Sequence, residues 1–245
     1  MREKICKASQ PLRLIVTLLL IACADISSVA QQIDSALQFD PSVAINLDIN
    51  EKVRAEFFIG HEDSEDITRN RWKVRAGLSY RLKPLFRGRL NDDPEGDKRY
   101  FLVVKTNYEY SRTTLSNNTD IEHRLTVEVT PRHQWPGRLL TSDRSRLEFR
   151  WINGLHHLRY RNRIRGERPF KMGKLTATPY ISAEAYWDQR FHKWNQVKFT
   201  GGADIPLSRN ISLDTYYERR NCITCPARHI NILGVSLNLY FKLKH

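Results

Sequence analysis

Residues 143–169 read DRSRLEFRWINGLHHLRYRNRIRGERP, and charged and apolar side chains alternate along them. Arg144, Arg146, Glu148 and Arg150 fall on one phase, with Leu147, Phe149 and Trp151 on the other. After a break at 152–154 the pattern restarts, with arginine at 159, 161, 163 and 165. Successive side chains point to opposite faces only in an extended strand. The stretch therefore predicts two strands with one apolar face and one face rich in guanidinium groups.

The same two-residue period returns from Ala44 onward and is clearest between Leu233 and Leu243, although Phe101 and Val103 interrupt it. About eleven strands are predicted, many of them longer than the ~5–6 residues usual in soluble proteins. A twelfth is predicted at Ser35–Phe39. Turn-forming residues predict breaks at 50–51, 61–66, 84–97, 116–118, 133–142, 166–173, 206–210 and 222–227.

Length and charge fit one or two folded domains in a chain of 245 residues with a net charge of +13. The hydrophobic content of 40 % is too high for a disordered chain. The arginines are spread over alternate strand positions and do not form a basic run. We therefore expect no nucleic-acid partner.

The N-terminus has the pattern of a secretory signal. Arg2, Lys4, Lys7 and Arg13 precede an apolar run at 14–24, and 28–30 (Ser-Val-Ala) predicts cleavage after Ala30. Removing four basic and two acidic residues would leave the mature chain at +11, that is 13 − 2. Two alternatives stay open: a retained membrane anchor, and a lipoprotein modified at Cys23. The apolar run is short for a membrane helix, which needs about 20 residues.

Two cysteines, Cys222 and Cys225, remain after the predicted cleavage. In an exported protein this spacing favours a disulfide that closes the tip of a hairpin. Redox chemistry and a zinc site are alternatives, but His229 is the one nearby candidate for a further zinc ligand. We predict no metal, cofactor or catalytic residues.

The alternation is compatible with two architectures, a soluble sandwich or lipocalin-like barrel and an outer-membrane barrel with lipid outside. Three features favour the membrane barrel: the export signal, strands longer than the ~9–11 residues needed to span a bilayer, and aromatic residues near strand ends. We predict an all-β, closed, antiparallel, up-and-down transmembrane β-barrel of about 10–12 strands. It would form a single domain over 31–245 after a signal peptide at 1–30.

In such a barrel the arginines face the lumen, where unpaired buried charge is costly. We therefore predict ladders of arginine and carboxylate side chains between strands, some of them bidentate. The predicted lumen ladder comprises Arg71, Arg75, Glu122, Arg124, Glu128, Arg144, Arg146, Glu148, Arg150, Arg159, Arg161, Arg163, Arg165 and Glu184. Because bases outnumber acids on this phase, we expect an electropositive lumen.

Several segments in order resemble one protein family: RNRWKVRAGLSYRL, IEHRLTVEV, SDRSRLEFRW, HLRYRNRIR, TPYISAEAYW and NILGVSLNLYF. The chain from about Ala44 to Phe241 resembles a family of uncharacterised bacterial outer-membrane β-barrels, known as a domain of unknown function. The resemblance implies a single barrel in the outer membrane of a Gram-negative bacterium. It implies no catalytic residues.

Three classes of function are compatible with this reading. The first is a structural barrel or a narrow, porin-like, anion-preferring pore for a small anionic solute. The second is a lipid-modifying enzyme of deacylase or phospholipase type, for which His123, Ser111 and Ser182 are weak candidates. His156, His157 and His192 near loops are equally weak. The third is a surface that binds lipopolysaccharide or a partner. Membrane lipid, lipopolysaccharide and the barrel-assembly machinery are the partners that an outer-membrane location predicts.

Overall fold

The computed structural model describes residues 35–64, 69–84, 97–115, 118–172, 175–225 and 227–243. The predicted signal peptide at 1–30, its cleavage site and Cys23 lie outside these residues. Within them the strands are β1 Ser35–Asp48, β2 Val53–Ser64, β3 Arg69–Pro84, β4 Tyr100–Leu115, β5 Asn118–Gln134, β6 Leu140–Ile152, β7 Leu155–Glu167, β8 Phe170–Met172, β9 Leu175–Asp188, β10 Lys193–Pro206, β11 Ile211–Cys222 and β12 His229–Lys242. Short 3-10 helices lie at η2 Asp97–Arg99, η3 Pro136–Arg138 and η4 Gln189–Phe191.

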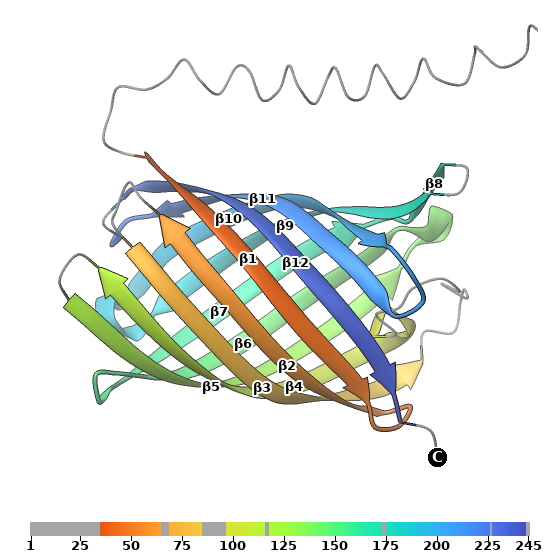
Figure 1. Cartoon of the computed structure of the whole chain (residues 1–245), viewed down its shortest axis with the longest axis horizontal. Coiled ribbons are helices and arrows are strands. Elements are labelled where there is room, and N and C mark those ends of the chain that lie inside the picture. The colour runs from red at the N-terminus through yellow and green to blue at the C-terminus, as the bar shows by residue number, and fades with distance from the viewer. Residues whose placement is uncertain are drawn as a thin grey trace, which may run out of the picture. The chain divides into compact units, whose positions relative to one another are not determined.

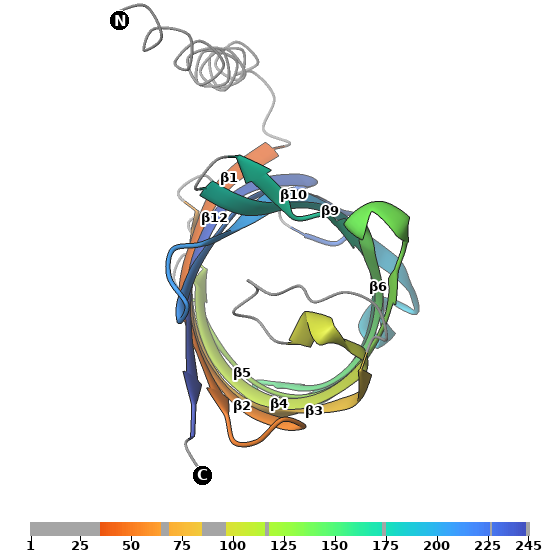
Figure 2. The same cartoon turned by 90° about the vertical axis from the view of Figure 1, so that its right-hand side faces the viewer.

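Eleven of the strands in the described residues close into a barrel (Figures 1 and 2). Neighbours along the chain pair antiparallel from β1 to β7, β7 pairs with β9, and the series continues through β10 and β11 to β12. Strand β8 is a short extension that pairs with β9. The predicted closed barrel of about 10–12 strands is confirmed. No helix in the described part of the chain is long and apolar enough to cross a bilayer.

The barrel closes at a parallel pairing between its first and last strands. All 14 residues of β1 are in register with β12, from Ser35 opposite His229 to Asp48 opposite Lys242. An odd number of up-and-down strands makes the first and last strands run in the same direction, so this junction cannot be antiparallel. Parallel pairs are slightly less stable per residue, so side chains near this seam contribute to closing the barrel.

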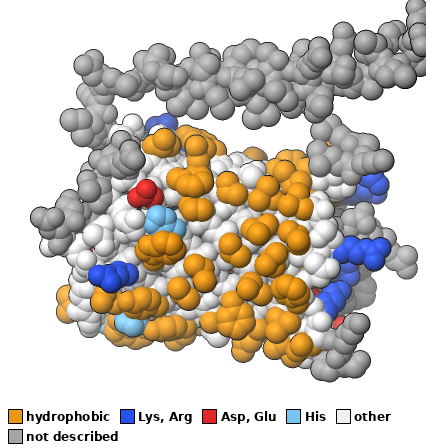
Figure 3. All heavy atoms as spheres, in the orientation of Figure 1, with side chains coloured by type: hydrophobic (Ala, Val, Ile, Leu, Met, Phe, Trp, Pro, Cys, Tyr) orange, Lys and Arg blue, Asp and Glu red, His pale blue; other side chains and the backbone are white. Residues whose placement is uncertain are grey.

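The two faces of the sheet separate side chains by polarity. The outer face carries apolar residues that remain about half exposed, among them Phe57 at 52 %, Val74 at 50 % and Leu233 at 49 % (Figure 3). The inner face carries buried charge, including Arg54 at 1 % and Glu148 at 0 % exposure. Apolar residues outside and charged residues inside are the distribution of a transmembrane barrel.

Apolar packing in the interior is confined to a small cluster. Ala36, Ala227, Ile230 and Ile232 are buried together near the start of β1 and β12, with Tyr216 against them. Most other fully buried side chains in the described residues are polar or charged. A soluble barrel would hold its main apolar core here, so this distribution is the opposite of the lipocalin-like alternative.

Several local predictions about strand limits are wrong. The predicted break at 133–142 overlaps the end of β5 and the start of β6, and that at 166–173 overlaps the end of β7 and all of β8. Ser35–Phe39 is not a separate strand, because it is the first part of β1. Pro41, which lacks an N–H, lies where the pairing of β1 with β2 is interrupted between Phe39 and Ser42. The break predicted at 61–66 begins too early, since β2 continues to Ser64 with Glu62 and Ser64 buried on the inner face. Val103 interrupted the alternation because it is an apolar residue on the inner face, fully buried.

The side chain of Tyr216 extends over Gly234 of β12 and reaches β1, across the parallel pair that closes the barrel. Tyr216 of β11 is opposite Gly234 of β12, and a Cβ at Gly234 would overlap the Tyr216 ring. The Tyr216 hydroxyl donates to Asp40 Oδ2 of β1 at 3.0 Å. Lys73 Nζ donates to Asp40 at 3.4 Å and to Glu62 at 2.7 Å. The absence of a side chain at Gly234 thus lets one hydrogen-bonded network join β11 to β1.

We expect Gly234→Ala to lower the free energy of unfolding by about 1–3 kcal/mol, the usual range for forced overpacking. The added methyl would displace Tyr216 and break its hydrogen bond to the partly buried Asp40. Gly201→Ala is the matched control, because a Cβ at Gly201 meets nothing within 4 Å. Urea unfolding in detergent measures both variants. Equal midpoints for the two would contradict the proposed role of this contact.

Candidate functional site in the barrel interior

The inner wall of β5, β6, β7 and β9 holds an unusual arrangement of directly opposed arginines. Arg124 is opposite Arg150, Arg146 is opposite Arg161, and Arg144 is opposite Arg163. Like charges directly opposite on neighbouring strands are destabilising. Each such pair therefore needs a negative group between its guanidinium ions.

Glu122 supplies that group for the first pair. Arg150 binds it in a bidentate manner, with Nε to Oε1 at 2.6 Å and Nη2 to Oε2 at 3.0 Å. Arg124 donates to the same Oε1 from Nε at 2.9 Å and Nη2 at 2.8 Å. Arg71 of β3 reaches Oε2 at 3.3 Å. One carboxylate thus links three strands.

Glu148 and Glu184 serve the second pair. Arg161 donates to Glu148 from Nη1 at 2.8 Å and is bidentate on Glu184, at 3.1 and 2.9 Å. Arg146 lies 3.7 Å from Glu148 and donates twice to Glu128, at 2.9 and 2.6 Å. These distances are those of charge-assisted hydrogen bonds.

The third pair, Arg144 and Arg163, is compensated differently. Arg144 Nη2 donates to Glu184 at 2.7 Å, and its Nη1 lies 3.9 Å from Glu128. Among the residues that the structure describes, Arg163 forms no ion pair. The Nε donors of Arg144 and Arg163 are both buried without a hydrogen-bond partner.

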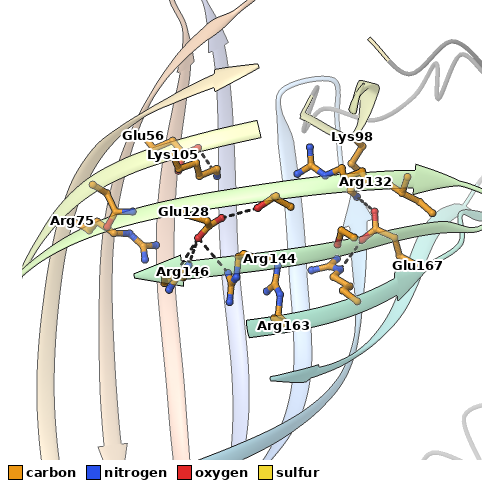
Figure 4. A pocket seen from close by; sticks show the side chains of 15 residues that line it. Glu56, Arg75, Lys98, Lys105, Glu128, Arg132, Arg144, Arg146, Arg163 and Glu167 are labelled. Carbon is orange, nitrogen blue, oxygen red and sulfur yellow. Dashed lines mark hydrogen bonds and ion pairs between the residues drawn. The ribbon is translucent and has the colours of Figure 1, made fainter. Parts of the chain in front are cut away.

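A cavity of about 230 Å³ opens beside this pair (Figure 4). Eight basic and three acidic side chains line it, which is an excess of five positive charges. The charged lining residues are Arg75, Lys98, Lys105, Arg132, Arg144, Arg146, Arg163, Arg165, Glu56, Glu128 and Glu167. Figure 4 shows Arg144, Arg146 and Arg163 close together on neighbouring strands.

The structure places all fourteen residues of the predicted ladder on the inner face. Arg75 lies 3.8 Å from Glu109 and over the Phe58 ring. Arg159 donates to Asp188 at 3.0 and 2.7 Å, and Arg165 lies 2.7 Å from Glu167. The remaining members have the partners described above, except Arg163.

Sequence reasoning missed two charged residues of the interior. Asp188 continues the inward phase of β9 at the end of that strand, and it accepts hydrogen bonds from Arg150, Arg159 and Arg190. The hydrogen bonds that Arg190 donates to Asp188 raise the pKa of Arg190, which lies in the turn that follows β9. Lys98 lies in η2, which Figure 2 shows in yellow inside the ring of strands, and it is 3.4 Å from both Glu167 and Asp204. No alternation marks Lys98, so no sequence signal could have placed it there.

Tyrosines also take part in the interior. Tyr186 accepts from Arg161 at 2.7 Å and lies under its guanidinium group, and Tyr180 lies under Arg165. Both fall on the polar phase of β9, which is the signal that would have found them. Stacking on an aromatic ring helps to hold a guanidinium group in a fixed position.

Cys222 and Cys225 form a disulfide at the β11–β12 tip. His229 instead hydrogen-bonds Asn221 at 2.9 Å. Across the described residues, no group of three His, Cys, Asp or Glu side chains could hold a metal ion.

Two of the weak catalytic candidates, His123 and Ser111, are not brought together. His123 lies on the outer face beside Tyr108 and Tyr110. Ser111 is buried on the inner face, where it accepts from Arg71 at 2.9 Å. The two side chains lie on opposite faces of the sheet, so they cannot act together as a nucleophile and its base.

A family model described as Protein of unknown function (DUF2490) matches residues 32–222. The chain belongs to this family. The match spans β1 to β11 and confirms the resemblance found in the sequence. The wall of opposed arginines therefore lies within the part of the barrel that matches the DUF2490 family.

Two solved structures are similar to this DUF2490 barrel. The β domain of the Bordetella autotransporter BrkA is 12 % identical, with 74 % of this chain and 80 % of that chain covered and a TM-score of 0.49. LpxR from Salmonella typhimurium is 10 % identical, with coverages of 77 % and 83 % and a TM-score of 0.46. The likeness is one of architecture alone. A comparison with curated proteins found no match.

Proposed function

We propose that this protein is an outer-membrane barrel that gives small anions a narrow path through an electropositive interior. The apolar outer face supports a position in lipid, and the export signal in the sequence supports the outer membrane of a Gram-negative cell. In this account residues 1–30 are a signal peptide and 31–245 the mature barrel. Lipopolysaccharide surrounds it, and the barrel-assembly machinery inserts it.

The observation that carries the proposal is the charge of the cavity. Eight basic side chains face three acidic ones around about 230 Å³. A confined space with an excess of one sign of charge concentrates counter-ions, and rings of arginine and lysine favour anions in pores. The ion pairs hold the arginines against the wall, so the path is narrow.

Bilayer recording tests the proposal directly. The purified full chain in a planar bilayer with a KCl gradient should give a reversal potential close to the equilibrium potential of chloride. Arg132→Glu at the cavity wall should move that potential toward the potassium side, whereas Arg138→Glu in the exposed η3 turn should leave it unchanged. Cation preference in the unaltered protein would overturn the anion path.

A structural barrel is the second candidate, and the density of interior ion pairs favours it. Carboxylates such as Glu122 and Glu184 each join several strands, which suits a protein whose task is mechanical. Folded protein that inserts into the bilayer and gives no channel events would support this candidate over the anion path.

A further inference from the structure

The third opposed pair differs from the other two in a way that points to a ligand. Glu122 lies between Arg124 and Arg150, and Glu148 lies between Arg146 and Arg161. Between Arg144 and Arg163 the described residues provide no carboxylate that contacts both. The directly opposed positions nevertheless carry two full positive charges on one wall of the cavity.

Unused donors mark the same place. The Nε groups of Arg144 and Arg163 are buried without partners, and both residues line the cavity. A buried donor that makes no hydrogen bond costs about 1–3 kcal/mol, more when it is charged. Two such donors on facing residues are the arrangement that an anion between them would satisfy.

We propose that Arg163 and Arg144 bind the phosphate group of a small soluble compound, either inorganic phosphate or a phosphate monoester. This inference rests on the proposed electropositive interior and names the class of anion that it takes. The phosphate replaces the missing carboxylate between the two guanidinium groups.

The chemistry of the lining favours phosphate over a carboxylate. A carboxylate presents its two oxygens in one plane, whereas phosphate presents oxygens in several directions and carries up to two charges. Donors here come from several walls: Arg75 of β3, Lys105 of β4, and the two arginines of β6 and β7. The cavity lies inside the barrel and is lined almost entirely by polar and charged side chains, which suit a soluble phosphate compound better than an acyl chain.

Calorimetric titration of the purified full chain with inorganic phosphate tests the site. Chloride and acetate at equal ionic strength are the comparison anions, and methyl phosphate represents the monoesters. We expect saturable binding of phosphate that Arg163→Gln weakens by about tenfold or more, as loss of a charged hydrogen bond would. Arg163→Lys keeps the charge and loses the fork, so it should bind with intermediate affinity. Arg138→Gln, the same charge change in an exposed turn, should bind as the unaltered protein does.

A second measurement needs no variant and holds if Arg163→Gln fails to fold. Phosphate should protect Arg163 from phenylglyoxal in the unaltered protein, as read by mass spectrometry of the peptide that contains it. The site would be overturned if titration with phosphate released no more heat than titration with chloride. Unchanged phosphate affinity in folded Arg163→Gln, or absence of protection from phenylglyoxal, would overturn it equally. Anion preference in bilayers without phosphate binding would overturn this inference alone, and phosphate binding with cation preference would overturn the path alone.

Discussion

Replacement of Glu148 by glutamine should destabilise the barrel by about 3–5 kcal/mol, the usual cost of removing one partner from a buried ion pair. Its side chain is 0 % exposed and faces three arginines, with Arg161 at 2.8 Å, Arg146 at 3.7 Å and Arg124 at 3.9 Å. Glutamine keeps the shape of the side chain and removes its charge. The three guanidinium groups would then repel one another in a place that water reaches poorly.

Glu56→Gln is the matched control for Glu148→Gln. Glu56 lies on the same inner face, but its side chain is 25 % exposed and the ion pair it forms, 2.7 Å from Lys105, is partly solvated. Partly exposed pairs contribute about 0–1 kcal/mol, so this variant should unfold close to the unaltered protein. Urea midpoints in detergent decide the matter. A Glu148→Gln midpoint no lower than that of Glu56→Gln would show that the interior charges are well hydrated.

An arginine placed on the outer face should cost almost as much. Val127 lies in the middle of β5 with its side chain 40 % exposed, between Thr106 of β4 and Leu147 of β6. An arginine at the bilayer midplane of a barrel costs about 2–4 kcal/mol. We therefore expect Val127→Arg to have a smaller free energy of unfolding in lipid vesicles and a smaller folded fraction than the unaltered protein.

Leu207→Arg separates the effect of lipid from that of lost apolar surface. Leu207 is 59 % exposed and follows β10 in the turn to β11, where water is expected. Its replacement should change folding by no more than the ~0.5 kcal/mol typical of surface sites. If both variants fold equally well in vesicles, the outer face of β5 does not contact lipid.

The alternation along residues 143–169 was sufficient to predict two strands and their two faces. The closed barrel had to be inferred from the same period along the whole chain, the export signal and the length of the strands. The alternation assigned Arg144 to Arg165 to one face because the side-chain period of a strand is two, whatever its partners are. The same rule fails where an apolar residue lies on the inner face, as Val103 does. It also fails where a strand continues through residues that resemble a turn, as at 61–64.

Pairing between distant residues could not be predicted in this way. The parallel contact of β1 with β12 depends on the number of strands, and an uncertainty of one strand reverses the direction expected at the seam. Lys98 enters the interior from a short helix that has no alternation. Register places Arg163 opposite Glu184 of β9, yet the Glu184 carboxylate accepts hydrogen bonds from Arg144 and Arg161 instead. Register alone therefore does not tell which arginine is left without an ion pair.

The central claim is that the apolar face of this sheet contacts acyl chains and its arginine face encloses the lumen. Spin labels on cysteines introduced at Phe57 of β2, Leu125 of β5 and Leu233 of β12 sample three strands of the barrel in lipid vesicles. Each should be relaxed strongly by oxygen, which dissolves in acyl chains, and weakly by a water-soluble nickel complex. Strong relaxation by the nickel complex at all three sites would place this face in water and contradict the account.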